Sequence, residues 1–290
     1  MPRTGAGLRT DTTTRLAELE QRRPEWGTWL ALLGAVDAAH ASRVPDFSVR
    51  LAGRDARPTP SEPLLHRSTL HIDAEWTRRL VRDLLSIAAG GDLAGGATLR
   101  GYRPSRDDAV GLVMAAVRQD VEVLGAVATS AGVDRGALAS VAHLAALPLL
   151  LACGRELESE IPGYWPQGYC PVCAAWPILA ERRGLDRSRR LRCGRCAAEW
   201  EVQWLCCIYC GENQHERLGM LEPDERGEQL KVETCGTCRA YLKSIASLQG
   251  FSAMELLLQD LETVELDLVA LERGYGRPEE RGFELEVMIG

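Results

Sequence analysis

Four Cys-x-x-Cys pairs lie between Tyr169 and Leu242: Cys170-Pro171-Val172-Cys173, Cys193-Gly194-Arg195-Cys196, Cys207-Ile208-Tyr209-Cys210 and Cys235-Gly236-Thr237-Cys238. A two-residue spacer lets two thiolates point at one metal ion, so two such pairs make one tetrahedral site. We therefore predict two metal ions per chain. The first site comprises Cys170, Cys173, Cys193 and Cys196; the second comprises Cys207, Cys210, Cys235 and Cys238. Disulfides or redox-active dithiols are the alternatives, and four pairs so close together favour metal ligands.

The residue after the second cysteine of such a pair usually turns left-handed, which favours glycine. Gly211 fits this expectation after Cys210, whereas Ala174 follows Cys173 and should cost about 1 kcal/mol if its backbone is left-handed. A closed site of four thiolates has no open position for Lewis-acid catalysis. It can support a fold, transfer electrons or sense metal, and it accepts either zinc or iron.

Two further cysteines, Cys153 and Cys206, are expected to be packing or spare thiols. In an extended segment, neighbouring side chains point to opposite faces, so Cys207 facing a metal sends Cys206 away from it. His215 lies inside the second module and could replace a cysteine ligand, but four thiols are already present there. Trp176 and Trp200 lie near cysteine pairs and are expected to cover the metal sites.

The chain has 290 residues and a formal charge of −7, which gives no general attraction to nucleic acid or anionic lipid. Residues 1–21 are polar and contain no apolar signal core. The longest apolar run, Ala137–Cys153, is too short to span a bilayer and is expected to form a buried core helix. These features predict a soluble, cytoplasmic protein without membrane insertion, in a compartment where thiols stay reduced.

Residues 11–160 carry helical patterns and predict five or six helices. Residues 43–71 are proline-rich and predict a loop, with a short extended piece at Ser68–Ile72. The expected helices are one capped by Asp11 or Thr12 and reaching Arg22, one from Pro24 through Val36, one capped by Asp73, one from the Ser105–Asp108 capping box through Leu124, and one over 134–158 with a candidate kink at Pro148.

The composition changes at Pro162, after which glycine, proline, tryptophan and cysteine become frequent. Small metal modules have such compositions because the bound ion substitutes for a hydrophobic core. The cysteine pairs form an approximate internal duplication, with strands expected at Trp200–Leu205 and Gln229–Glu233. We predict an α-helical domain over 1–161, two rubredoxin-like or zinc-ribbon-like modules over 162–205 and 206–249, and a C-terminal helix and tail over 250–290.

A capping box formed by Ser252 and Glu255 predicts the start of the last helix. Its apolar stripe is expected to pack on the rest of the protein, and Gly274 and Gly276 should end it. The stripe comprises Met254, Leu257, Leu261, Val264, Leu268 and Leu271. Residues 277–290 carry no pattern that predicts a structure.

The segment Glu181–Arg195 contains seven arginines. A nucleic-acid surface is conceivable there, but a solvated loop or a docking surface for an acidic partner fits the negative chain better. The five histidines (His40, His66, His71, His143 and His215) form no metal pair, and no P-loop, dinucleotide fingerprint or nucleophile elbow is present. No feature indicates enzymatic turnover.

The chain resembles the FdhE family of formate dehydrogenase accessory proteins. The resemblance is carried by Cys170-Pro171-Val172-Cys173, Leu191-x-Cys193-x-x-Cys196-x-x-x-Trp200, Cys207-x-x-Cys210, Glu233-x-Cys235-x-x-Cys238-x-x-Tyr241-Leu242-Lys243, Asp260-Leu261-Glu262-Thr263, Asp267-Leu268 and Gly274-Tyr275, with a weaker likeness at Pro63-Leu64-Leu65. Ala174 departs from the glycine that the family favours. The first 60 and last 14 residues match weakly.

The resemblance implies a helical domain followed by two rubredoxin-like metal domains, with iron favoured over zinc. It implies a non-enzymatic maturation factor that binds the catalytic subunit of a respiratory, molybdenum-containing formate dehydrogenase in the cytoplasm. Two other functions remain open: a zinc-ribbon adaptor that binds nucleic acid or another protein, and a rubredoxin-like electron carrier. A homodimer is also possible.

Overall fold

The computed structural model describes residues 6–42, 44, 47–51, 61–223, 229–278 and 281–290. The chain divides into two compact units, which we describe separately. The first unit contains residues 1–50, 67–153 and 286–290, and the second contains residues 51–66 and 154–285. The four-part division expected from composition, with its boundaries at 161, 205 and 249, stays a prediction.

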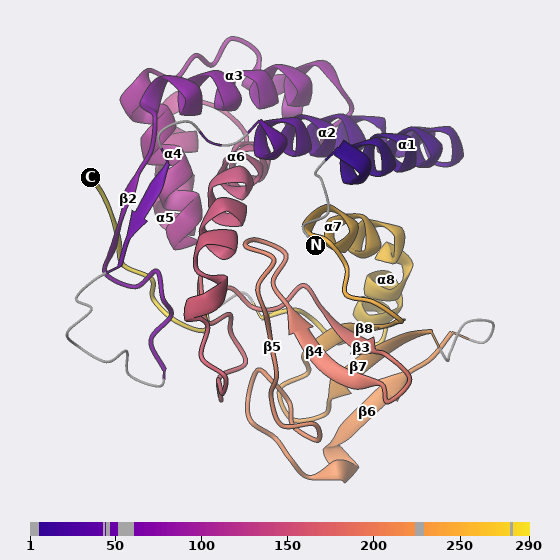
Figure 1. Cartoon of the computed structure of the whole chain (residues 1–290). Coiled ribbons are helices and arrows are strands. Elements are labelled where there is room, and N and C mark those ends of the chain that lie inside the picture. Colours follow the sequence, from indigo (N-terminus) through magenta and orange to yellow (C-terminus); the bar gives the residue numbers. More distant parts are fainter. Residues whose placement is uncertain (1–5, 43, 45–46, 52–60, 224–228, 279–280) are drawn as a thin grey trace. The chain divides into compact units, whose positions relative to one another are not determined.

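In the described part of the chain, six α-helices form most of the first unit (Figure 1). Helix α3 contacts both α2 and α4, and α1 packs along α2. The helices are α1 (Ala6–Arg22), α2 (Gly27–Ala41), α3 (Ala74–Gly90), α4 (Arg106–Arg118), α5 (Val121–Ala131) and α6 (Arg135–Glu156, which continues into the second unit), with short 3-10 turns η1 (Pro24–Trp26) and η2 (Gly96–Leu99).

Side-chain caps set the starts of α3, α4, α5 and α6, the last through the Asp134 carboxylate, which accepts the Ala137 N–H. Asp73 accepts the Trp76 N–H at the start of α3, and Ser105 and Asp108 form the expected capping box of α4. The helix expected to run from Ser105 through Leu124 is in fact two. Gln119 adopts a left-handed conformation (φ +57°), and the Asp120 side chain then caps α5.

One other detail of the helices differs from expectation. Helix α1 begins at Ala6, so Asp11 and Thr12 lie inside it and do not precede it. Helix α6 matches the helix expected over 134–158 and contains Pro148, and the candidate kink there stays a prediction. Among the described residues, α6 is the one helix long and apolar enough to cross a membrane, and 78% of its most apolar window is buried in the protein. A buried core helix meets the same criteria.

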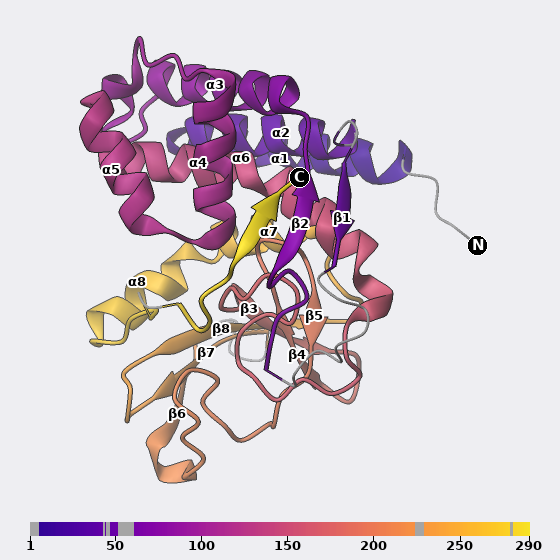
Figure 2. The same cartoon turned by 90° about the vertical axis from the view of Figure 1, so that its left-hand side faces the viewer.

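A small sheet completes the first unit (Figure 2). Strand β2 (Ser68–His71) confirms the expected extended piece and pairs with β1 (Ser48–Arg50), which the sequence analysis placed in a loop. Strand β9 (Val287–Ile289) pairs with β2 in parallel, so the uninterpreted tail contributes a third strand. The Arg118 guanidinium donates to the Val287 carbonyl and ties β9 to α4.

One six-stranded sheet runs through the second unit in the order β5-β4-β3-β8-β7-β6 (Figure 1). Each cysteine module supplies an antiparallel three-stranded part, and the parallel pairing of β3 with β8 joins the two parts. The strands are β3 (Leu179–Arg183), β4 (Ser188–Arg192), β5 (Glu199–Trp200), β6 (Leu218–Leu221), β7 (Leu230–Cys235) and β8 (Tyr241–Ser247), with 3-10 turns η3 (Glu158–Glu160) and η4 (His215–Arg217).

The strand order is the same in both modules, since β5-β4-β3 of the first is followed across the sheet by β8-β7-β6 of the second. This arrangement agrees with the approximate internal duplication expected from the cysteine pairs. The strand expected at Gln229–Glu233 is present as β7, but only Glu199–Trp200 is extended where Trp200–Leu205 was expected. The prediction of a solvated loop at Glu181–Arg195 is wrong. Most of it forms the hairpin β3–β4, in which Glu181, Arg182, Arg189 and Arg192 are buried.

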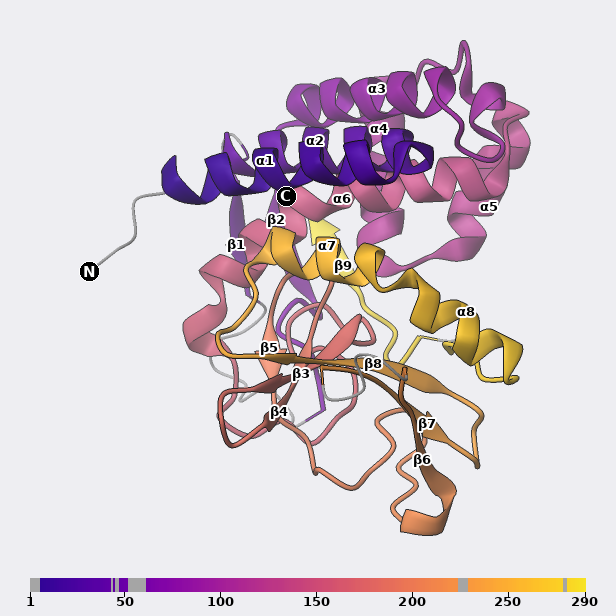
Figure 3. The same ribbon diagram turned by 90° about the vertical axis from the view of Figure 1, so that its right-hand side faces the viewer.

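Two C-terminal helices cover one face of this sheet (Figure 3). The capping box of Ser252 and Glu255 starts α7 (Ala253–Glu262), and a break at Thr263 separates it from α8 (Val264–Glu272). The expected single helix is therefore wrong, because the break changes which residues face the sheet. Leu256, Leu266 and Ala270 pack against Leu179, Leu230, Val232, Tyr241 and Ile245, while Leu268 and Leu271 of the expected stripe are exposed.

Candidate metal centres

The eight predicted ligands gather into the two predicted groups of four. Within each group, the four Sγ atoms lie within 4.8 Å of one another. In the first group, Sγ–Sγ distances of 3.4 Å join Cys170 to Cys196 and Cys173 to Cys193. In the second group, distances of 3.7 Å join Cys207 to Cys238 and Cys210 to Cys235.

These separations fit a tetrahedral metal ion. Zinc–sulfur bonds of about 2.3 Å hold tetrahedral ligands about 3.8 Å apart. A disulfide would need a sulfur–sulfur distance of about 2.05 Å, and none of the ten cysteines forms a disulfide. Each group could therefore hold one metal ion, and the donor set is compatible with zinc or iron.

All four cysteine pairs adopt the same loop. In each loop, the first cysteine N–H donates to a carbonyl five residues on, and its carbonyl accepts from the residue after the second cysteine. That last residue is left-handed every time: Ala174 (φ +64°), Ala197 (φ +60°), Gly211 (φ +76°) and Arg239 (φ +59°). The expectation of left-handed backbone at Ala174 and Gly211 is confirmed.

The thiols of the first group influence one another strongly because all four are buried. Burial raises the pKa of the Cys170 and Cys196 thiols. Burial acts the same way on Cys193, but hydrogen bonds from Cys170, Cys173 and Cys196 outweigh it and lower the pKa of Cys193. A bound cation would compensate several thiolates together in this enclosed space.

The two groups differ in their access to solvent. Every cysteine of the first group is buried, whereas Cys210 and Cys238 of the second group are exposed. Burial still dominates at Cys238 and raises the pKa of its thiol to about 11. An ion in the second group would thus be within reach of a chelator or a partner, and an ion in the first group would be enclosed.

The residues set aside as non-ligands lie outside both groups. The Cys206 thiol points to the Cys207 carbonyl at 3.5 Å, and Cys153 is buried in α6. The His215 side chain is exposed and lies beside Glu216. Trp176 is placed between the modules, because its ring makes edge contacts with Tyr169 and Tyr209 on either side.

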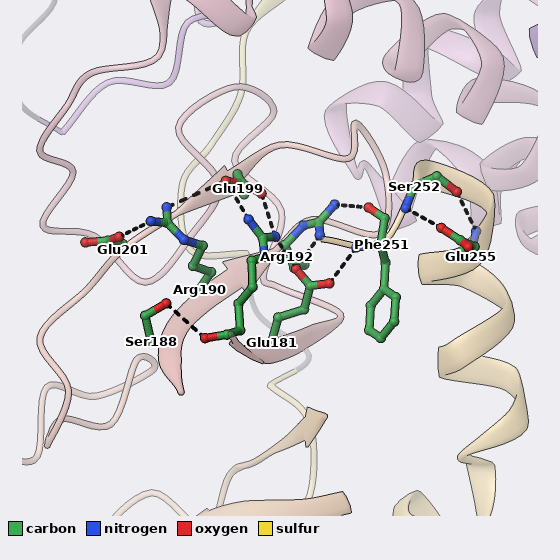
Figure 4. Close-up of polar contacts among 10 residues, drawn as sticks. Glu181, Ser188, Arg190, Arg192, Glu199, Glu201, Phe251, Ser252 and Glu255 are labelled. Carbon is green, nitrogen blue, oxygen red and sulfur yellow. Dashed lines mark hydrogen bonds and ion pairs between the residues drawn. The ribbon is translucent and has the colours of Figure 1, made fainter. Parts of the chain in front are cut away.

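A buried ionic network supports the first module (Figure 4). The fully buried Glu181 carboxylate accepts hydrogen bonds from Arg183 and Arg192. It also accepts from the Phe251 N–H at 2.7 Å, just before α7, and Arg192 donates to the Phe251 carbonyl. The arginine-rich segment thus holds the sheet to the start of α7, a role that its composition alone did not indicate.

A second network anchors α7 and α8 beside the other module. The buried Lys243 ammonium pairs with Asp260 at 2.6 Å and Asp267 at 2.7 Å. Asp267 also accepts from the Tyr241 hydroxyl, and Arg277 pairs with both aspartates. Burial would raise the pKa of Asp267, but Lys243 and its hydrogen bonds lower it. Tyr241, Lys243, Asp260 and Asp267 belong to the motifs that carry the family resemblance, and the geometry gives them a structural role.

The first cysteine pair is held by a segment more than one hundred residues before it. The N–H groups of Leu64 and Leu65 donate to the carbonyls of Pro171 and Val172 at 2.8 and 3.0 Å. The Tyr169 hydroxyl also donates to the Ser61 carbonyl. Backbone contacts of this kind leave no periodic signal, although the likeness at Pro63-Leu64-Leu65 marked the segment.

Comparisons with known proteins agree with this architecture. The family model described as "FdhE, C-terminal domain" matches residues 205–282. Proteins named "Protein FdhE homolog" are similar to this chain: one from Haemophilus influenzae (strain PittEE) is 32% identical over 114 residues, covering 38% of this chain and 36% of the relative, and one from Aquifex aeolicus (strain VF5) is 30% identical over 115 residues, covering 38% and 40%. The chain thus spans less than half the length of the curated relatives it matches.

A solved structure extends the likeness of the fold to nearly the whole chain. The crystal structure of the FdhE protein from Pseudomonas aeruginosa matches with a TM-score of 0.56 and 22% sequence identity, covering 93% of this chain and 92% of that one. The fold and the cysteine groups define a protein with an α-helical region, two four-cysteine sites suited to zinc-ribbon-like metal binding and C-terminal helices. The C-terminal part of the chain is thus similar in sequence to FdhE proteins, and the fold of nearly the whole chain is similar to that of a solved FdhE protein.

Proposed function

We propose that this protein is a cytoplasmic, non-enzymatic maturation factor for a respiratory, molybdenum-containing formate dehydrogenase, and that it binds the catalytic subunit of that enzyme. The identity of the client enzyme is inferred from the resemblance to the FdhE family. One structural observation supports the proposal most: the cysteine group with solvent access lies inside the part of the chain that matches the FdhE C-terminal domain. A metal site that meets a client must be reachable from outside.

The eight cysteines are the proposed ligands, and iron is the proposed metal. Cys170, Cys173, Cys193 and Cys196 would hold an enclosed ion whose main effect is to stabilise the fold. Cys207, Cys210, Cys235 and Cys238 would hold the accessible ion. Bound iron would supply one-electron chemistry, and bound zinc would supply structural support alone.

Gene deletion tests the function. In the source organism grown anaerobically, deletion should lower formate dehydrogenase activity while the enzyme's transcript stays intact. The full-length gene should restore activity, and a Cys210→Ser, Cys238→Ser double variant should restore it poorly. Unchanged activity in the deletion strain, under conditions in which the enzyme is made, would refute the maturation role.

Affinity purification tests the proposed partner. The tagged protein from anaerobic cells should co-purify with the catalytic subunit of formate dehydrogenase, identified by mass spectrometry. Purification of a different client instead would overturn this assignment.

An electron carrier is the second candidate, because the exposed Cys210 and Cys238 would bring an iron ion within reach of a redox partner. Rapid, reversible bleaching of an iron-loaded protein by a reductase would favour it. The nucleic-acid adaptor function has less support, since three of the seven arginines of the arginine-rich segment (Arg182, Arg189 and Arg192) are buried and add nothing to a basic surface.

A further inference from the structure

A small apolar pocket lies directly beside the second cysteine group. Its walls include Ile208, Tyr209 and Leu242, and two metal-ligand candidates, Cys207 and Cys235, also line it. The cavity volume is about 120 Å³. Small-molecule and cofactor sites usually measure about 300–1,000 Å³, so this pocket has the size for one side chain.

Three large apolar side chains of this pocket are open to solvent. Trp204 is 52% exposed, Leu205 58% and Met220 49%. Single exposed apolar residues are common, but a group of three around one cavity marks an interaction site. None of the three is a cysteine ligand or a member of the two ionic networks described above.

A buried polar atom points to a hydrogen-bond acceptor on the occupant. The Arg189 side chain is 4% exposed, lines the pocket, and binds Glu233 through Nε and Nη2. Its Nη1 is buried and, in the described part of the chain, has no hydrogen-bond partner. Leaving such a donor unpaired costs free energy, so an acceptor such as a peptide carbonyl would be favoured there.

The adjoining strand can supply further main-chain contacts. Within the described residues, β6 pairs only with β7 and forms one end of the six-stranded sheet. Its Leu218, Gly219 and Met220 line the pocket. An edge strand presents unpaired N–H and C=O groups, which an extended polypeptide can engage.

Charge favours a basic occupant. Among the described residues between Trp204 and Leu242, four are acidic and three are basic. Four thiolates around a divalent ion would add about two more negative charges. Glu233 already neutralises Arg189, so the pocket does not offer a cationic site to a carboxylate.

We propose that this pocket docks an extended segment of a partner polypeptide, which inserts one large apolar side chain and carries lysine or arginine beside it. Docking there would place the partner against the second cysteine group. This proposal rests on the proposed function in one respect, which is that the partner is a protein. The identity of that protein is left open.

Binding of short peptides to the metal-loaded full chain tests the proposal. The probes are fluorescein-labelled heptapeptides Gly-Lys-Gly-X-Gly-Lys-Gly with X as Leu, Met, Phe or Trp, followed by anisotropy. At least one should bind saturably, and binding should weaken tenfold or more when X is Ser or when both lysines are Glu. Absence of saturable binding by all four, or equal binding of the Ser peptide, would overturn the proposal.

Protein variants locate the binding site. Leu205→Ser and Met220→Ser should each weaken binding at least fivefold without changing the metal content. Leu185→Ser is the matched control, because Leu185 is 94% exposed in the turn between β3 and β4 and lies outside the pocket. Equal loss in the control would refute this location. These outcomes are independent of the gene-deletion result, so the two proposals can fail separately.

Discussion

Left-handed backbone after each cysteine pair is the residue-scale feature that shapes both metal centres. Gly211 adopts it without a steric cost, while Ala174, Ala197 and Arg239 adopt it with a side chain attached. The spacing of the cysteines predicted which of them come together in each group of four, because a two-residue spacer permits few geometries. The left-handed backbone at Ala174 was predictable from its position after a cysteine pair, and Ala197 and Arg239 occupy the same position in their pairs.

Gly211→Ala should lower the free energy of unfolding by about 1–2 kcal/mol, the cost of left-handed backbone for a residue with a Cβ. A Cβ at Gly211 meets no atom within 4 Å, so the effect reports backbone strain alone. Gly163→Ala is the control, since its Cβ also meets nothing and its φ is not in the left-handed range. Urea unfolding of the zinc-loaded protein measures both, and equal stability of the two variants would contradict this account.

The adjacent thiols Cys206 and Cys207 test the assignment of ligands. Cys207→Ser should remove one metal ion and destabilise the second module, because metal binding supplies folding free energy to such modules. Cys206→Ser should keep both ions and cost about 1–2 kcal/mol at most. Elemental analysis of the two variants decides the matter, and loss of an ion from Cys206→Ser alone would show that the assignment is reversed.

At the scale of elements, the arginine-rich hairpin shows where sequence patterns stop being informative. The arginine-rich composition of this segment suggested a solvated loop. In the structure, Glu181 lies in a buried strand and accepts a hydrogen bond from Phe251, seventy residues further along, and such a distant contact cannot be inferred from local composition. Helix α8 gives a second example. The break at Thr263 changes which residues of the apolar stripe face the sheet. Only the capping box at Ser252 could be predicted from the local sequence.

Glu181→Gln should destabilise the second unit by about 3–5 kcal/mol, because it leaves the guanidinium groups of Arg183 and Arg192 without their buried carboxylate. Glu201→Gln is the matched control. Glu201 also pairs with an arginine, Arg190, but its side chain is 61% exposed, so the loss should be about 0–1 kcal/mol. Urea midpoints measured on the metal-loaded variants compare the two, and a small effect at Glu181 would refute the supporting role of this network.

At the scale of the whole molecule, the described residues form two units. Helices and a small sheet make up the first, and a sheet that carries both cysteine groups, with α7 and α8 on one face, makes up the second. The helical N-terminal region, the two cysteine groups and the C-terminal helical segment were predictable from patterns within short windows. The joining of the two modules into one sheet was not, because the parallel pairing of β3 with β8 links residues more than sixty positions apart.

The two cysteine groups differ in their access to solvent, so a chelator should distinguish the two metal sites. Native mass spectrometry of protein purified without chelator should show two metal ions per chain. After a chelator is added, a one-ion species should accumulate, because Cys210 and Cys238 leave the second site open while the first is enclosed. Cys170→Ser should remove that persistent species. A chain that carries one ion or none at the start, or that loses both ions at the same rate, would contradict the account.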